Sequence, residues 1–483
     1  MAATRFSGNK GESSREQSAQ RAVVHAAPDR AATHSGEQAL ALRELAAGGE
    51  AVGRLADGRV VFVPGGAPGE EAAVALTAVH RTYARAQLLR VLSPSPHRVV
   101  PPCPLAAAAP APNQDAPLAE AACGGCPLMH VERAAQLQAK QEWVGRALRH
   151  SGAVVLPIQA PTADLGYRVR ARLMVRQGQL SFASARSHRG VPIRRCAVLE
   201  PSLEAVLLGQ GQAIAAALGE GGTLAGLLGG GQGTTAVHLS VQLAPGGRIG
   251  AVRAWLQTLL QAKRISGAKL FAAMTAGGPG EAEVFGEPAV NLAADGDAPL
   301  WAGADGFAQA SAAGHHALPR LVAELVGTAA DGGRWPRLIE LYAGSGNFTR
   351  VLRPLADHIV AIEGDAAAAA RLRRLFERGS PASAAAVTVV AESAEHALAR
   401  LLRESARFDI AVLDPPRTGA QSVLAALNRL AVRRVVYVSC DAMTLGRDLV
   451  ELRASGLRPR SVQPLDLMPH TAQVECVAVL DAD

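Results

Sequence analysis

The stretch Leu338-Ile-Glu-Leu-Tyr-Ala-Gly-Ser-Gly-Asn-Phe-Thr349 decides the fold of the C-terminal part of the chain. Its first half is apolar except for Glu340, which is typical of a parallel strand buried on both faces. Gly344 and Gly346 then mark a tight turn, where the backbone can approach a ligand closely. The stretch therefore predicts a buried strand that carries a glycine loop to the carboxyl edge of a parallel sheet.

Further apolar runs follow at regular intervals, with helical patterns between most of them: His358–Ile362, Val387–Ala391, Phe408–Leu413, Arg434–Val438, Ser461–Leu465 and Val474–Leu480. This alternation predicts a doubly wound, Rossmann-like α/β domain, which we place at residues 301–483. A short loop joins the last two runs, which predicts a final antiparallel hairpin.

The rest of the chain divides into three parts. Residues 1–36 are polar without any period and predict a disordered tail. Residues 37–98 alternate short β-type runs with Gly/Pro turns, which predicts a small OB-like β-barrel whose arginines could bind RNA phosphates. Taken alone, those arginines fit solvated turns better. Residues 99–300 predict a central α+β domain, with helices over 131–149 and 203–218 and a flexible glycine-rich loop at 219–234.

Composition narrows the class of protein. The 483 residues are 49% hydrophobic, enough for sizeable cores, and carry a net charge of +7. Neither a signal peptide nor an apolar run of about eighteen residues is present, so we expect a cytoplasmic protein without a membrane partner. The positive charge permits an RNA partner, although an arginine-rich chain with only four lysines also fits a GC-rich genome.

An acidic residue follows the glycine loop at a nucleotide-binding spacing. Glu363 ends the next strand, where a carboxylate can accept hydrogen bonds from ribose hydroxyls. The third glycine of the dinucleotide pattern is missing, because Thr349 follows Phe348. We therefore expect a nucleoside cofactor without a pyrophosphate, and S-adenosylmethionine is the candidate.

Three more strand ends bring reactive groups to the same edge of the sheet. Asp414 opens Asp-Pro-Pro-Arg417, Cys440 follows Val438-Ser, and Glu475 begins the last strand. A thiolate that adds to C6 of a pyrimidine activates C5 towards a methyl sulfonium, and a base must then remove the C5 proton. These residue types therefore predict pyrimidine C5 methylation.

Four motifs resemble the RNA uracil-5 methyltransferase family: Gly344–Thr349, Asp414–Gly419, Ser439–Asp448 and Asp466–Glu475. Leu55–Val63 resembles the TRAM domain of its ribosomal-RNA members, and the resemblance spans about residues 40–480. It implies that Cys440 is the nucleophile and Glu475 the proton-abstracting base. It further implies a cofactor site lined by residues of the loop and neighbouring strand ends: Gln309, Tyr342, Gly344, Gly346, Asn347, Glu363 and Asp414.

The chain departs from the family pattern at three places. Glu340 stands where the family usually has Asp, and His315 and His316 lie where it tends to have asparagine. An asparagine expected after the third strand is replaced by Glu392 or Ser393. These departures leave every catalytic group in place and the adenine contact unassigned.

Four cysteines lie outside the α/β domain: Cys103, Cys123, Cys126 and Cys196. Four thiols suit an iron–sulfur cluster or zinc. The resemblance implies a [4Fe–4S] cluster, and zinc is less favoured. Nineteen residues separate Cys103 from Cys123, an insertion relative to the family. We expect His130 to be a surface histidine and Cys476 a core thiol.

We expect methyl transfer from S-adenosylmethionine to C5 of a uridine through a covalent Cys440 adduct, in 23S rRNA rather than tRNA. The barrel and the cysteines favour ribosomal RNA, and no obligate protein partner is inferred. RNA cytosine-5 methylation is one alternative, although its usual second cysteine is absent from Asp414–Arg417. A catalytically silent RNA-binding factor is the other.

Overall fold

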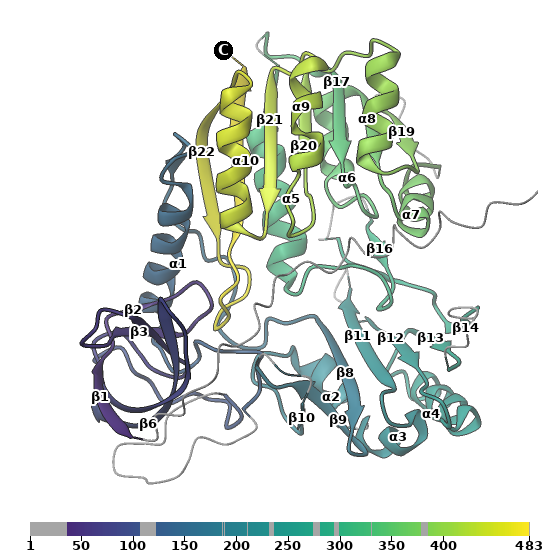
Figure 1. The fold of residues 1–483 in the computed structure, drawn as a ribbon. Coiled ribbons are helices and arrows are strands. Elements are labelled where there is room, and N and C mark those ends of the chain that lie inside the picture. The colour runs from purple at the N-terminus through teal and green to yellow at the C-terminus, as the bar shows by residue number, and fades with distance from the viewer. Residues whose placement is uncertain are drawn as a thin grey trace, which may run out of the picture.

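The computed structural model describes residues 36–106, 122–185, 187, 189–209, 211–230, 236–273, 281–293, 299–329, 331–377 and 385–482. Figure 1 shows three main bodies, with a barrel and a central sheet below a larger α/β unit. The predicted disordered tail, apart from Gly36, lies outside the described residues, as does most of the insertion after Cys103. Within the described residues, no helix combines the length and apolar character needed to cross a membrane.

The N-terminal body is a six-stranded sheet rolled into a barrel, in the order β1-β5-β6-β4-β3-β2. Its side chains alternate between the inside and the outside: Val61, Val63, Ala84 and Leu88 are fully buried, while their neighbours face outward. The strands are β1 (Glu37–Ala41), β2 (Glu44–Leu45), β3 (Ala51–Arg54), β4 (Val60–Val63), β5 (Glu71–Val79) and β6 (Tyr83–Ser93).

The central body is a seven-stranded sheet in the order β10-β9-β8-β11-β12-β13-β14. Three helices pack their apolar faces on it: α2 (Pro201–Leu207), α3 (Gly211–Leu218) and α4 (Ile249–Gln261). The strands are β8 (Arg170–Arg176), β9 (Gln179–Ala183), β10 (Gly190–Pro192), β11 (Thr223–Gly229), β12 (Ala236–Gln242), β13 (Gly267–Phe271) and β14 (Glu283–Gly286). A two-stranded ribbon of β15 (Val290–Asn291) and β16 (Trp301–Ala302) follows.

The expected flexible loop at 219–234 is wrong for its described part, because β11 is the middle strand of this sheet. Its glycine serves packing: a Cβ on Gly226 would lie 2.7 Å from Leu203 Cδ1, so only glycine lets α2 approach this closely. The single helix expected over 203–218 is also wrong, since α2 and α3 are separate helices.

The C-terminal body is an eight-stranded sheet in the order β19-β18-β17-β20-β21-β23-β22-β7. The first five strands of that order are mutually parallel, whereas β22 and β23 form the antiparallel hairpin that the sequence predicts. The strands are β7 (Val154–Val155), β17 (Trp335–Leu341), β18 (Ala356–Ile362), β19 (Ala386–Val390), β20 (Ile410–Leu413), β21 (Arg434–Ser439), β22 (Leu457–Leu465) and β23 (Glu475–Ala482).

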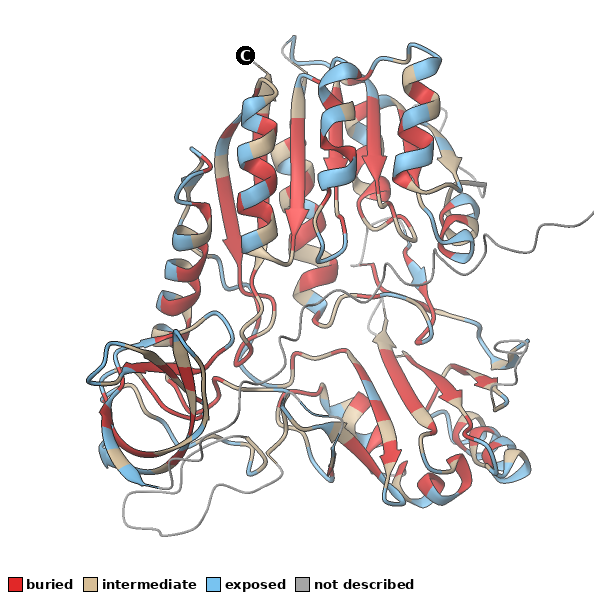
Figure 2. Ribbon diagram, viewed as in Figure 1, coloured by how far each residue is buried: buried red, intermediate tan, exposed pale blue. Residues whose placement is uncertain are grey.

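Helices cover both faces of this sheet, whose strands are largely buried (Figure 2). Leu338 packs with one set: α5 (Ala312–Val326), α6 (Thr349–Leu352) and α7 (Ala366–Glu377). Its neighbour Ile339 packs with the other: α8 (Ala394–Arg403), α9 (Gln421–Arg429) and α10 (Ala442–Ala454). The carboxyl ends of the parallel strands point towards the central sheet (Figure 1).

Helix α1 (Arg133–Leu148) joins the barrel to the C-terminal sheet, running beside α10 (Figure 1). Trp143 Nε1 donates to the barrel carbonyl of Leu45 at 2.6 Å. About one turn earlier in the helix, Lys140 Nζ lies 2.7 Å from Asp466 Oδ1, and both side chains are fully buried. Asp466 also pairs with Arg133. The helix therefore fixes the loop that follows β22.

His130 is not the surface histidine that we expected. It is fully buried, and its Nε2 lies 2.8 Å from the carbonyl oxygen of Gly66 in the barrel. Burial lowers the pKa of its imidazole to about 4, so the ring is neutral at physiological pH. His130 therefore joins the barrel to the segment that follows Cys126.

Replacing Asp466 by Ala should lower the free energy of unfolding by roughly 3–5 kcal/mol, because the Lys140 ammonium would stay buried without its carboxylate. Glu44→Ala is the matched control: it breaks an exposed pair with Arg146 on the same helix and should cost at most about 1 kcal/mol. Denaturant midpoints of the two variants test this. If the two variants lost the same free energy of unfolding, the buried pair would stabilise the protein no more than the exposed one.

Candidate active site

The glycine loop after β17 leaves the sheet through left-handed backbone. Tyr342, Gly344 and Gly346 have φ values of 62°, 58° and 96°. A Cβ on Gly346 would lie 2.6 Å from Leu372 Cδ1, whereas a Cβ on Gly344 would meet no atom within 4 Å. Gly346 is thus required for packing, while the backbone at Gly344 borders open space where a ligand can approach.

Glu363, at the end of β18, closes this loop. The backbone N–H of Gly344 donates to its Oε2 at 2.7 Å, and the N–H of Asp365 donates to its Oε1 at 2.6 Å. Asn347 carries a buried Oδ1 without a hydrogen-bond partner. A carboxylate held by backbone donors and an unpartnered amide beside an open loop fit a nucleoside with ribose hydroxyls.

Gln309 approaches from a separate segment, where its side chain packs over Gly314 at the start of α5. His315, the next residue of α5, is buried. Burial lowers the pKa of this histidine to about 4.

The side chains of Glu392 and Ser393, directly after β19, make local contacts with α8. Ser393 Oγ caps α8 by accepting the backbone N–H of His396 at 3.3 Å, and Glu392 pairs with Arg400. Neither side chain takes the place of the asparagine expected there, so the adenine contact stays unassigned.

Cys440 and Glu475 come together because β21 and β23 are antiparallel neighbours. Ser439 pairs with Cys476, so Cys440, which follows Ser439, and Glu475, which precedes Cys476, lie at the same edge of the sheet. Burial, and next the negative charge of Glu475, raise the pKa of the Cys440 thiol. The charge and hydrogen bonding of Arg417 oppose this rise. The thiol thus lies between an acid and a guanidinium.

Two more carboxyl groups lie in this crevice. Burial raises the pKa of Asp414 to about 7, and burial with the charge of Asp414 raises that of Glu475 to about 8. Glu340 is fully buried in β17, where its Oε2 accepts from Thr349 Oγ1 at 2.6 Å. Burial raises its pKa to about 8, and the charges of Asp414 and Glu363 add to the rise. The glycine loop and the thiol therefore lie near the same group of buried acids, which Asp414 links electrostatically.

Arg417 is a site residue that our sequence analysis did not assign. Its Nη2 donates to Gln473 Oε1 at 2.8 Å, which links the turn after β20 to the loop before Glu475. Its place in Asp414–Gly419, three residues after a crevice carboxylate, is the signal that could have identified it.

The loop from Asp466 to Glu475 is held by the segment that follows Cys126. Gln136 accepts the backbone N–H of His470 at 2.9 Å, and the N–H of Leu128 donates to the His470 carbonyl at 2.9 Å. Tyr167 donates its hydroxyl to the Pro469 carbonyl at 3.0 Å. His470 takes a left-handed φ of 64° to make this turn.

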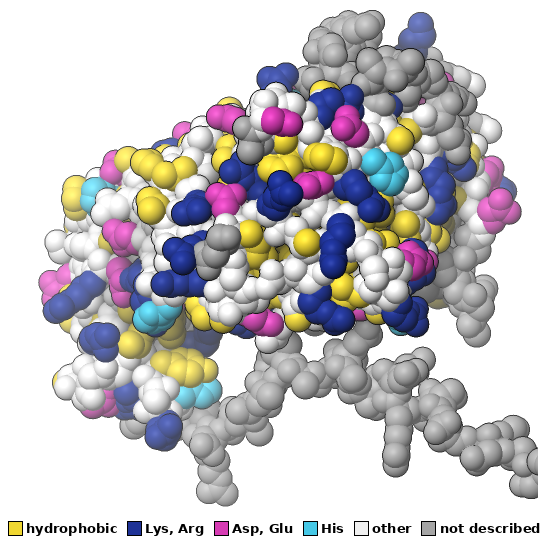
Figure 3. Space-filling model, turned by 90° about the horizontal axis from the view of Figure 1, so that it is seen from above, with side chains coloured by type: hydrophobic (Ala, Val, Ile, Leu, Met, Phe, Trp, Pro, Cys, Tyr) yellow, Lys and Arg dark blue, Asp and Glu magenta, His cyan; other side chains and the backbone are white. Residues whose placement is uncertain are grey.

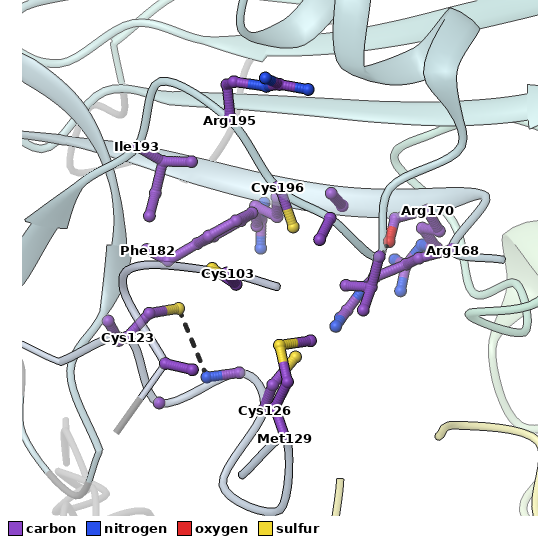
Figure 4. A pocket seen from close by; sticks show the side chains of 18 of the residues that line it. Cys103, Cys123, Cys126, Met129, Arg168, Arg170, Phe182, Ile193, Arg195 and Cys196 are labelled. Atoms are coloured by element: carbon purple, nitrogen blue, oxygen red, sulfur yellow. Dashed lines mark hydrogen bonds between the residues drawn. The ribbon is translucent and has the colours of Figure 1, made fainter. Parts of the chain in front are cut away.

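All four candidate metal-binding cysteines line one cavity of about 450 Å³ (Figure 4). Arginines from the segment before β8, from β8 and from the loop after β10 line it too: Arg168, Arg170, Arg172 and Arg195. Burial raises the pKa of the Cys126 thiol to about 12, and the neighbouring cysteines add to this rise. Within the described part of the chain, however, no three His, Cys, Asp or Glu side chains form a group that could hold a metal ion. The donor set fits a thiolate-bound centre, whereas the arrangement does not yet support the expected cluster.

Known families match both ends of the chain. The TRAM domain matches residues 37–89, and the family described as tRNA (Uracil-5-)-methyltransferase matches residues 305–483. The 23S rRNA (uracil(1939)-C(5))-methyltransferase RlmD of Edwardsiella ictaluri is 31% identical over 456 residues, which cover 91% of this chain and 94% of that protein. The chain belongs to the RNA uracil-5 methyltransferase family.

Two further proteins are similar to this chain, one in sequence and one in fold. An RNA methyltransferase of Gloeobacter violaceus without an assigned role is 29% identical to this methyltransferase, over 90% of this chain and 94% of that protein. A tRNA (uracil-54, C5)-methyltransferase of Pyrococcus abyssi, solved with S-adenosyl-L-homocysteine, is similar in fold. Its TM-score is 0.65 at 21% identity, over 92% of this chain and 100% of that one.

Glu340 should make the stability of the methyltransferase fall as the pH rises. The folded chain keeps this proton up to about pH 8, whereas the unfolded chain releases it near the ordinary value of 4.5. Between these values the folded state binds more protons, so its stability decreases with increasing pH. Glu340→Gln should flatten this decrease, with its largest gain over the parent chain near pH 8.

Urea midpoints measured from about pH 4 to about pH 8 test this, since that range spans both ionisations. Glu71→Gln, an exposed carboxylate of β5, is the control and should leave the curve unchanged. A Glu340→Gln curve parallel to that of the parent chain would show that Glu340 ionises normally.

Proposed function

We propose that this methyltransferase transfers a methyl group from S-adenosylmethionine to C5 of a uridine in cytoplasmic 23S rRNA. The observation that carries the proposal is the meeting of Cys440, Glu475 and Arg417 beside the glycine loop, in a chain of this family. The ribosomal substrate is favoured by the names of the relatives, which describe 23S rRNA enzymes, together with the TRAM domain.

In the proposed mechanism, the Cys440 thiolate adds to C6 of the uracil. The electrons of the C5–C6 double bond move onto C5 and O4 as an enolate. C5 then takes the methyl group, and the electrons of the broken carbon–sulfur bond stay on the donor sulfur. Glu475 removes the C5 proton, and the released electron pair restores the double bond and expels the thiolate.

Each neighbouring side chain has a role in this sequence. Arg417 favours the thiolate form of Cys440 by its positive charge. Asp414 would orient the uracil or the donor. Its negative charge raises the pKa of Glu475. Since the pKa of Glu475 is about 8, turnover should increase as the pH rises through that value.

The donor would be held by the loop residues. Glu363 can bind the ribose hydroxyls, and Asn347 offers a buried acceptor to the donor. Gln309, just before α5, and Tyr342, just after β17, would close the pocket, with Gly344 and Gly346 giving the backbone access. When bound, the donor supplies an electrophilic methyl sulfonium.

The three bodies suggest a division of labour, with boundaries at residues 37–98, 99–300 and 301–483. The barrel would bind RNA, and the target uridine must leave its stack to reach Cys440. On the opposite side, the face at the amino ends of the parallel strands mixes basic, acidic and apolar side chains (Figure 3). Arg434 and Arg460 both bind Asp481 at this end of the sheet. The proposed RNA path therefore runs along the carboxyl edge.

A [4Fe–4S] cluster on Cys103, Cys123, Cys126 and Cys196 is part of the proposal. The support is that four thiols from three separate segments line one cavity without a competing thiol from elsewhere in its lining. Zinc is the alternative that the same donors would accept. No step of the methyl transfer passes through this centre.

The first test of the function uses transcripts that contain 5-fluorouridine. Fluorine at C5 cannot leave as a proton, so Cys440 should remain covalently attached to the methylated RNA in a complex that survives denaturation. Cys440→Ala should form no complex, because it lacks the nucleophile.

With unmodified RNA, Glu475→Gln should transfer the methyl group and accumulate the covalent adduct, since proton removal is blocked. Ribosomal and transfer RNA transcripts are compared in parallel. Adduct with tRNA alone would overturn the ribosomal assignment, and release of product by Glu475→Gln at the parent rate would overturn its role as base. A covalent complex with a transcript that carries the modified base at cytidines, and not at uridines, would favour RNA cytosine-5 methylation.

The metal proposal is tested by elemental analysis after anaerobic reconstitution with iron and sulfide. About four iron atoms per chain are expected, and Cys126→Ser should lose them because one ligand is missing. Cys440→Ser is the control and should retain the iron, since this cysteine lies outside the cavity. One zinc per chain, or no metal, would overturn the cluster.

A further inference from the structure

The outer surface of the barrel carries an aromatic group that the barrel core does not use. Strand β4 alternates, with Val61 and Val63 fully buried inside and Phe62 half-exposed outside. On β6, Ala84 is fully buried while Tyr83 is half-exposed outside. Since the interior is filled without these rings, their outward placement calls for another explanation.

The rings form one continuous cluster. Tyr83 stacks on His80, with ring centroids 4.4 Å apart and planes at 22°. Phe62 meets Tyr83 edge-on, with centroids 6.0 Å apart and planes at 73°. The backbone N–H of His80 donates to the Tyr83 carbonyl at 2.8 Å, which fixes the turn that carries both rings. We call His80, Tyr83 and Phe62 the aromatic platform.

Arginines flank the platform on the same face. In the sheet register, Val60 pairs with Arg54 on one side and with Tyr83 on the other, so Arg54 and Tyr83 face outward in one row. Phe62 pairs with Arg85, whose guanidinium lies 5.7 Å from the Phe62 centroid and binds Glu50 at 2.9 Å. Arg54 and Arg81 are exposed. Positive charge therefore borders partly exposed aromatic rings.

We propose that the aromatic platform is a stacking site for an unpaired nucleobase of single-stranded RNA, with Arg54 and Arg81 on the flanking phosphates. Rings and arginines together match what a single strand offers, since every base presents a π-face and every linkage a negative charge. A duplex hides its base faces, so it would contact only the arginines. The inference rests on the proposed RNA substrate and names a contact site away from the crevice.

The test measures binding of the full-length protein to a labelled single-stranded oligouridylate of about twelve nucleotides, within the usual site size of small barrels. Tyr83→Ala should weaken binding by about tenfold, the usual effect of losing one stacking partner. The slope of affinity against salt should stay unchanged, because no phosphate contact is lost. Arg54→Ala should instead reduce that slope.

Three further variants serve as checks. Tyr83→Phe keeps the ring and should bind like the parent chain, and Ser93→Ala, exposed at the far end of β6, should also have no effect. His80→Ala removes the end of the stack without touching β6, and should weaken binding even if Tyr83→Ala proves unstable. A 2-aminopurine base in the oligonucleotide should lose fluorescence on the parent chain and regain it on Tyr83→Ala.

Unchanged affinity and fluorescence for both His80→Ala and Tyr83→Ala would overturn the platform. An equal loss of binding to duplex RNA would also overturn it, in favour of a purely electrostatic surface. The readout is independent of the methyl-transfer assay. If the parent chain is trapped on 5-fluorouridine RNA and the platform variants bind the oligouridylate normally, the platform alone is refuted. If the parent chain is trapped on no RNA, the proposed function is refuted.

Discussion

Lys140 and Asp466 are both fully buried, and the Lys140 ammonium would be left without its carboxylate partner if Asp466 were lost. Helix α1 supplies the lysine, and the loop between β22 and β23 supplies the carboxylate. Before it reaches Glu475, the same loop donates a hydrogen bond to Gln136 and accepts one from Tyr167. The position of the proposed base therefore depends on a helix more than 300 residues earlier in the chain, and through it on contacts with the barrel.

Three buried carboxyl groups lie around the proposed active site. Glu340, Asp414 and Glu475 all have raised pKa values, chiefly because burial disfavours their charged forms. Negative charges near Cys440 raise the pKa of its thiol and so disfavour the thiolate. The positive charge of Arg417 lowers that pKa. A sulfonium donor brings a further positive charge, so cofactor binding and ionisation of the crevice should favour one another.

The α/β domain could be predicted closely, because buried parallel strands are apolar throughout and end at recognisable motifs. The positions of Cys440 and Glu475 at strand ends were also predictable, since each borders a strand whose neighbours follow from the alternation, whereas their catalytic roles stay a prediction. The middle strand β11 was not: its glycines suggest a loop, and only the packing of Leu203 against Gly226 explains them. His130 was misjudged for a related reason, because its partner, Gly66, lies in another body of the chain. Long-range contacts of this kind leave no local pattern.

Strand β7 has only two residues, yet it pairs in parallel with β22, which would otherwise be the edge of the sheet. Its neighbour Leu156 continues the contact by donating its N–H to the Val462 carbonyl at 2.9 Å. An open edge beside an apolar hairpin invites other chains to add strands and aggregate. The short segment after α1 therefore protects the folded enzyme from self-association at the very hairpin that carries Glu475.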